Sequence, residues 1–143
     1  MAEKYGFAAL RHLRVGSRLL EQSEFDDAGY HFGVSGENSL KEALVICGLA
    51  LKWKDTIKKK DSPMSAHLPK ITILIHALRD EIAVSAVGRR GAAISAVVLD
   101  DDFPNRFLRW SIDIRYADDE CTPVSEEDCR KWELDAPILL KNL

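Results

Sequence analysis

Apolar and small side chains recur at helical spacing along most of this chain, and that periodicity constrains its fold more than any other feature. Residues three or four positions apart share one face of a helix. The longest stripe lies within residues 24–47: Phe25, Ala28, Phe32, Ser35, Ser39 and Ala43. Residues 3–22 predict an earlier amphipathic helix, and residues 69–82 a later one. We therefore expect an all-α fold, an up-and-down bundle of four or five helices.

Local signals predict where these helices begin and end. Ser23 is expected to cap the second helix and Ser125 the last one, because a hydroxyl can accept the first free backbone N–H groups. A break is expected at residues 61–63, and residues 88–91 are expected to break or kink the preceding helix. Residues 92–99 could form a buried helix or a strand, and we favour the helix. Proline is expected to open a helix at Pro69 and Pro104, and to kink or end the last helix at Pro137.

Three glycines, Gly29, Gly33 and Gly36, lie within the predicted second helix. Each costs about 1 kcal/mol against alanine in a helix interior. Close approach of another helix explains them best. We expect a homodimer that buries these small residues or the aromatic residues near Trp110, because a monomer alone leaves them under-packed.

Length and composition fit one domain over residues 1–143. Of the 143 residues, 46% are hydrophobic and 30% are charged, and the net charge of −3 gives no general case for nucleic-acid binding.

The three cysteines lack metal-type spacing, so reduced thiols in a cytoplasmic protein are expected. No segment approaches the roughly 20 apolar residues of a membrane span. Metal and phosphate-loop motifs are also absent, so we expect no cofactor and no metal.

The second helix carries polar residues on two of its arcs. Glu37 and Lys41 form an i,i+4 pair in the favoured order, and His31 lies on the other arc among Asp27, Asn38 and Glu42. One interpretation is a groove that holds a phosphate or a base. The other is a polar seam satisfied by a neighbouring helix. The sequence leaves both open.

Two basic clusters are further candidates for binding phosphate. The first is Lys52, Lys54, Lys58, Lys59 and Lys60, where Trp53 could stack on a base. A solvated helix end is the alternative. The second comprises Arg106, Arg109 and Arg115 with Tyr116. Arginine suits bidentate phosphate contacts, but pairing with Asp113 or Asp118 is the structural alternative.

Two segments, in order, resemble HEPN domains. Residues 27–41 read DAGYHFGVSGENSLK, with an aromatic residue, small residues, and then Glu37 followed by Leu40-Lys41 in a helix. Residues 110–118 read WSIDIRYAD, an aromatic followed by Arg115-Tyr116 before a polar turn. His67 lies where family members often have a histidine opening the third helix. The resemblance covers most of residues 20–120.

The resemblance implies an all-α bundle that commonly dimerises and is associated with nucleotides and RNA. Such domains occur beside nucleotidyltransferase-like partners in toxin–antitoxin pairs, in antiviral defence and in RNA processing. Many are metal-independent ribonucleases whose active site is an Arg, four to six residues, then a His. No histidine of this chain has an arginine at that spacing, and Arg109 is followed by Arg115 instead. Arginine cannot serve as a general base.

We therefore predict a non-catalytic HEPN-like domain that binds a nucleotide, RNA or a cognate protein, with no role at a membrane. Arg109, Arg115 and Tyr116 are expected to bind phosphate. Glu37 and Lys41 are expected to organise the groove along the second helix and to orient the arginines. One alternative is a ribonuclease that uses His31 or His67 as a relocated base. A second is a purely structural dimerisation module.

Overall fold

The computed structural model describes residues 4–116 and 124–140, with the side chains of residues 115, 116, 139 and 140 left out. Helices make up the secondary structure of this part of the chain, and no strand occurs in it. The all-α class is therefore confirmed. None of the helices described is long and apolar enough to cross a bilayer. The α-helices are α1 (Tyr5–Glu21), α2 (Phe25–Ile46), α3 (Leu49–Thr56), α4 (Lys70–Ala77), α5 (Arg79–Ser85), α6 (Gly88–Val98), α7 (Glu126–Asp135) and α8 (Pro137–Leu140).

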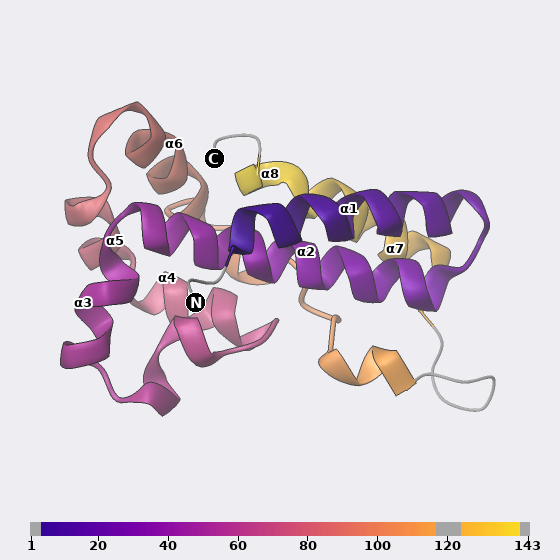
Figure 1. The fold of residues 1–143 in the computed structure, drawn as a ribbon, viewed down its shortest axis with the longest axis horizontal. Coiled ribbons are helices and arrows are strands. Elements are labelled where there is room, and N and C mark those ends of the chain that lie inside the picture. The colour runs from indigo at the N-terminus through magenta and orange to yellow at the C-terminus, as the bar shows by residue number, and fades with distance from the viewer. Residues whose placement is uncertain (1–3, 117–123, 141–143) are drawn as a thin grey trace.

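The two longest helices, α1 and α2, form an antiparallel hairpin (Figure 1). Ser35 donates its hydroxyl to the carbonyl of Ala9 at 2.7 Å, deep in the contact between the two helices. Gly16 of α1 lies directly over the Phe32 ring of α2, which is fully buried. Small residues on both helices thus let the hairpin close tightly.

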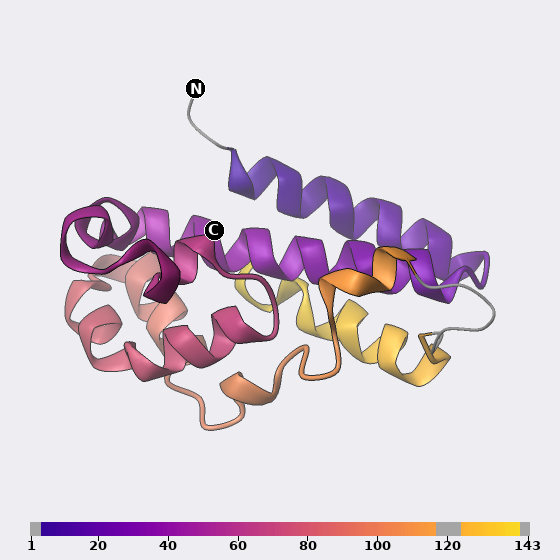
Figure 2. The ribbon, with the colours of Figure 1, turned by 90° about the horizontal axis from the view of Figure 1, so that it is seen from below.

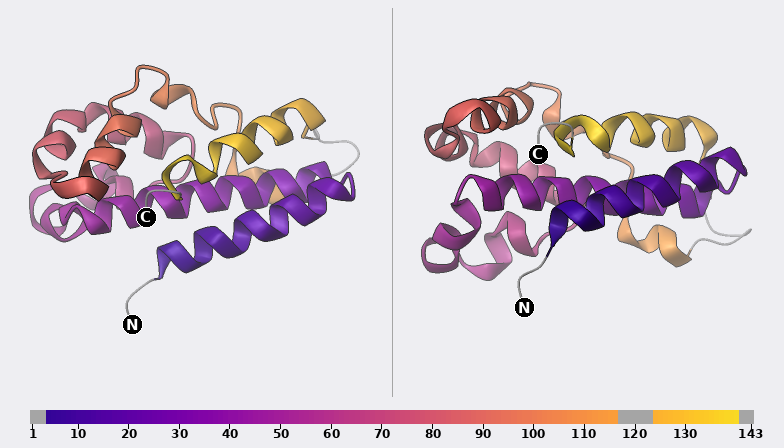
Figure 3. Two further views of the ribbon diagram at one scale, coloured as in Figure 1. Left: turned by 90° about the horizontal axis from the view of Figure 1, so that it is seen from above. Right: turned by 45° about the horizontal axis from the view of Figure 1, so that its top comes forward.

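The shorter helices surround one end and one side of this hairpin. Helices α3 to α6 gather at the end of α2 that leads into α3 (Figure 1). Seen from below and from above, α2 lies between α1 and the pair α7–α8 (Figures 2 and 3). Short 3-10 turns connect the elements: η1 (Lys59–Asp61), η2 (Pro63–Ser65), η3 (Phe103–Asn105) and η4 (Ile112–Tyr116).

The three glycines of α2 face aromatic residues of the same chain. A Cβ atom at Gly29 would collide with Trp132, one at Gly33 with Trp110, and one at Gly36 with Phe107. These three aromatic residues are buried, and the indole N–H of Trp110 donates to the Gly29 carbonyl at 2.8 Å. The reason given above for a dimer is therefore wrong, because the chain fills its own small-residue face. Whether the protein dimerises stays a prediction.

The arrangement differs from a bundle of four or five long helices. The helix predicted over residues 69–82 is divided at Leu78, which leaves helical geometry between α4 and α5. The helical segment does break before Gly88, as α5 ends at Ser85, but residues 88–91 form the start of α6, with Gly88 at φ of +77°. Near Pro104 only the short turn η3 forms. After α2, short helices therefore replace the longer ones that were expected.

Of the two capping predictions, the one for the second helix is wrong and the one for the last helix is confirmed. Glu24, not Ser23, precedes α2, because Ser23 occupies a left-handed turn with φ of 60°. Ser125 does cap α7, accepting the Asp128 N–H at 3.0 Å. Pro137 ends the first part of the last helix as predicted.

Candidate functional site

Glu37 lies at the centre of a polar cluster in the middle of α2. Its carboxylate accepts from Lys41 Nζ at 3.3 Å, His67 Nδ1 at 3.0 Å and the backbone N–H of Leu68 at 3.3 Å. The side chains of Glu37 and Lys41 are each only 11% exposed. A buried carboxylate needs this many donors because desolvation of a charge is costly unless it is paired. We call Glu37, Lys41 and His67 the α2 polar cluster.

His67 is the member of the α2 polar cluster that reaches solvent, with 59% of its side chain exposed. An ionised carboxylate only accepts hydrogen bonds, so Glu37 requires the proton of a neutral His67 ring on Nδ1. Nε2 is then an acceptor. A carboxylate that fixes a histidine in this way leaves an oriented nitrogen able to bind a donor or to take a proton.

The α2 polar cluster also fastens the segment that precedes α4. Glu37 holds His67 through its ring and Leu68 through its backbone. A few residues earlier, the Ser62 hydroxyl accepts the Met64 N–H at 3.2 Å and fixes the start of η2. Residues 62–68 are thus anchored at both ends, which gives the surface beside them a defined shape.

A groove of about 670 Å³ lies next to this anchored segment. Lys54 and Lys59 are the charged residues that line it, and neither forms an ion pair with any residue that the structure describes. We call this feature the α3 groove. Its lining residues are Tyr5, Val45, Ala50, Trp53, Lys54, Ile57, Lys59, Ser62, Met64 and Ser65.

Trp53 cannot stack on a ligand base, contrary to the expectation for the lysine cluster. Its side chain is buried, and the indole N–H donates to Glu81 Oε1 at 3.0 Å. Lys52 pairs with the same carboxylate at 3.0 Å. The hydrogen bonds from Lys52 and Trp53 hold the pKa of Glu81 below its usual range. Trp53 therefore forms part of the rigid wall that joins α3 to α5.

The arginines do not join the α2 polar cluster through any described contact. Arg109 is 79% exposed, with Nη1 at 3.6 Å from Asp128 Oδ1 on α7. Arg106 donates Nη1 to the buried Asp135 at 2.9 Å. The backbones of Arg115 and Tyr116 form the end of η4, but their side chains lie outside the described residues. The roles assigned to Arg109, Arg115 and Tyr116 stay predictions.

His31, the other histidine considered as a relocated base, faces α1. Its Nδ1 lies 2.8 Å from His12 Nδ1, and the two rings stack with centroids 5.1 Å apart. Burial lowers the pKa of both histidines, and the charge of His31 lowers the pKa of His12 further. One ring must accept from the other, so this contact holds α1 against α2. The sequence offered no signal that His12 was the partner.

Comparison of the chain with protein-family models, curated proteins and solved structures gives no match. Among the residues that the structure describes, no three metal-type ligands converge. The site is accordingly defined by its own geometry: a buried carboxylate–lysine pair, an exposed histidine that it orients, and an adjoining basic groove.

Proposed function

We propose that this chain is a HEPN-like domain that binds a phosphorylated ligand, a nucleotide or RNA, without cleaving it. The supporting observation is that Glu37, Lys41 and His67 meet in one cluster. His67 lies 30 positions after Glu37 in the chain, yet all three are among the residues that carry the resemblance to the family. A toxin–antitoxin or defence setting, with a nucleotidyltransferase-like partner, follows from the resemblance.

The chemistry of the surface favours binding. In the α2 polar cluster the ammonium group of Lys41 pairs with the carboxylate of Glu37. We therefore expect this cluster to position the site and not to bind phosphate itself. Positive charge for phosphate comes from Arg109, which is exposed, and from Lys54 and Lys59 of the α3 groove. Ammonium and guanidinium groups both form charge-assisted contacts with phosphate oxygens.

Fluorescence polarisation with a short 5′-phosphorylated RNA tests this proposal. We expect saturable binding at low salt that weakens as salt rises, because phosphate contacts release counterions. Arg109→Ala should weaken binding about tenfold at unchanged thermal stability if Arg109 makes one charge-assisted contact. Arg130→Ala, on an exposed pair with Glu126, is the matched control and should bind normally. No binding by the unaltered protein would refute the proposal.

One observation favours a second candidate, a metal-independent ribonuclease with His67 as its base. The His67 ring is exposed and oriented by Glu37 through Nδ1, which suits Nε2 to accept a proton. The primary proposal expects no cleavage of RNA in the presence of a chelator. Cleavage that is lost in both His67→Gln and Glu37→Gln, with the fold intact, would replace it with this candidate.

A further inference from the structure

The α3 groove combines an apolar interior with a basic rim. Ala50, Trp53 and Lys54 come from one face of α3, and Ile57 follows directly after that helix. Met64 and Ser65 form the opposite wall from η2, and Val45 contributes from α2. A volume of about 670 Å³ falls within the usual range of small-molecule sites.

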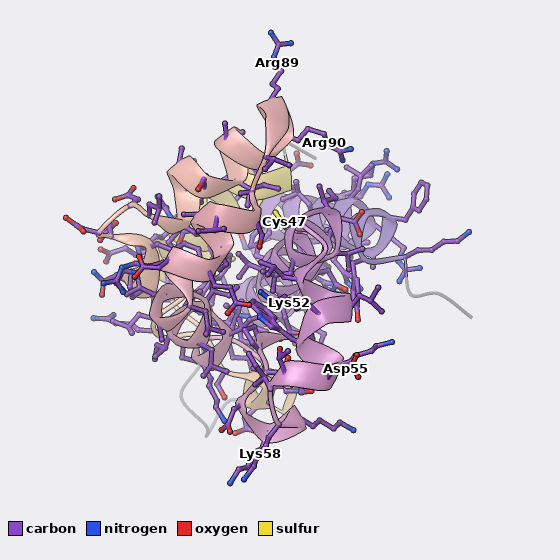
Figure 4. The ribbon with its side chains drawn as sticks, turned by 90° about the vertical axis from the view of Figure 1, so that its left-hand side faces the viewer. Cys47, Lys52, Asp55, Lys58, Arg89 and Arg90 are labelled. Carbon is purple, nitrogen blue, oxygen red and sulfur yellow. The ribbon has the colours of Figure 1, made fainter. Side chains whose placement is uncertain are left out.

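Among the residues that the structure describes, the charged residues that line the groove are Lys54 and Lys59, both positive. Asp55 and Lys52 lie on the other faces of α3, and Lys52 is already paired with Glu81. Figure 4 shows Lys52, Asp55 and Lys58 one after another along α3 and the residues that follow it, with Lys58 at the edge of the molecule opposite Arg89. The groove is therefore complementary to an anion that carries an apolar body.

We infer that the α3 groove binds a single nucleotide, with its phosphate between Lys54 and Lys59 and its base against Val45, Ile57 and Met64. This inference rests on the proposed function and assigns the ligand a location distinct from the arginines. Lysine provides a point charge for phosphate, while aliphatic side chains and a thioether accept the flat face of a base. Ser62, Met64 and Ser65 of the groove wall belong to the segment that Glu37 anchors at His67 and Leu68, so the groove and the α2 polar cluster share this segment.

An acidic peptide is the competing occupant, and the geometry favours the nucleotide. Peptides that bind along a surface use an exposed strand edge or an extended apolar groove. The walls of the α3 groove are helices and 3-10 turns, so its backbone offers no strand edge. Two lysines, Lys54 and Lys59, line the described groove, which suits one phosphate group better than a run of acidic side chains.

The test uses matched pairs of charge reversals and NMR of backbone amides. The groove variant combines Lys54→Glu with Lys59→Glu. The control combines Lys58→Glu with Lys60→Glu, which changes net charge equally in the same region at lysines that do not line the groove. The probes are adenosine 5′-monophosphate, adenosine, inorganic phosphate and a hexaglutamate peptide.

We expect adenosine 5′-monophosphate to shift amides of residues 45–65 saturably and to bind at least about tenfold more tightly than adenosine or phosphate alone, as one charge-assisted contact implies. The groove variant should lose most of that affinity, and the control should stay within about threefold, the scale of a screened surface charge. Hexaglutamate binding in place of the nucleotide would overturn the inference.

The result also separates this inference from the proposed function. Binding of nucleotide or RNA with shifts elsewhere, or equal losses in the groove variant and the control, would overturn the inference and leave the proposed function standing. Absence of binding by RNA and by every nucleotide probe would overturn both.

Discussion

Replacing Lys41 with methionine should destabilise the protein strongly, because it isolates the buried charge of Glu37. Methionine keeps most of the lysine stem, so the change removes the ammonium and leaves little cavity. Lys41 Nζ and Glu37 Oε2 lie 3.3 Å apart, and each side chain is 11% exposed. Breaking a buried ion pair from one side costs about 3–5 kcal/mol. His67 and Leu68 still donate to Glu37, so we expect the lower end, about 3 kcal/mol.

Urea denaturation followed by circular dichroism measures this free energy of unfolding. For a chain of this size the loss corresponds to a fall in melting temperature of roughly 6–12 °C. Glu37→Gln alone should also destabilise. The double variant should cost less than the sum of the two, with a coupling energy of about 2 kcal/mol, because it removes both charges together.

The pair Glu126 and Arg130 provides the control for this experiment. It has the same i,i+4 spacing, but its side chains are 54% and 59% exposed. Arg130→Met should therefore cost less than about 1 kcal/mol. If Lys41→Met costs no more than this control, the charge of Lys41 is solvated and our account of the α2 polar cluster is wrong.

Three further predictions concern the packing and the titratable groups. Gly33→Ala forces a Cβ atom into the Trp110 ring and should lower the free energy of unfolding by about 3 kcal/mol or more, so a change under about 1 kcal/mol would refute the contact. Burial holds the pKa of His12 and His31 below 6.5, so the unfolded chain binds more protons below that value. Stability should therefore fall from about pH 7.5 to about pH 5.5, less steeply in His31→Gln, as urea titrations at each pH would show. Burial, together with Glu133, raises the pKa of the Cys129 thiol to about 11, so iodoacetamide at about pH 8 should label Cys129 only in the unfolded protein, and rapid native labelling would contradict this.

The long helices were predictable from sequence because one continuous stripe governs each. The expected bounds of the first two helices lie within about two residues of those of α1 and α2. The break at Leu78 was not predictable, since the apolar stripe from Ile71 to Ile82 continues across it. Hydrophobic periodicity predicts which face of a helix is buried. It does not predict where the helix is interrupted so that this face keeps packing against the core.

Contacts between residues far apart in the chain could not be predicted, because local sequence patterns do not show which distant residue is the partner. The i,i+4 pair of Glu37 and Lys41 can be recognised locally, but nothing near it indicates that His67 is the third member. The glycines of α2 signalled close packing, yet could not show that Trp110 comes from the same chain. Trp53 was misjudged because lysines flank it in the sequence, whereas its ring is buried and its indole N–H bonds to Glu81, 28 positions away.

The imidazole nitrogens of His67 provide the most direct test of the α2 polar cluster as the organiser of a ligand site. Nitrogen-15 NMR of the ring, assigned with His67→Gln, reports its tautomer and its response to a 5′-phosphorylated RNA. We predict the Nδ1–H tautomer in the free protein and a saturable shift of Nε2 as RNA is added. Saturable RNA binding that leaves both nitrogens unchanged, or a free protein with the Nε2–H tautomer, would contradict the account.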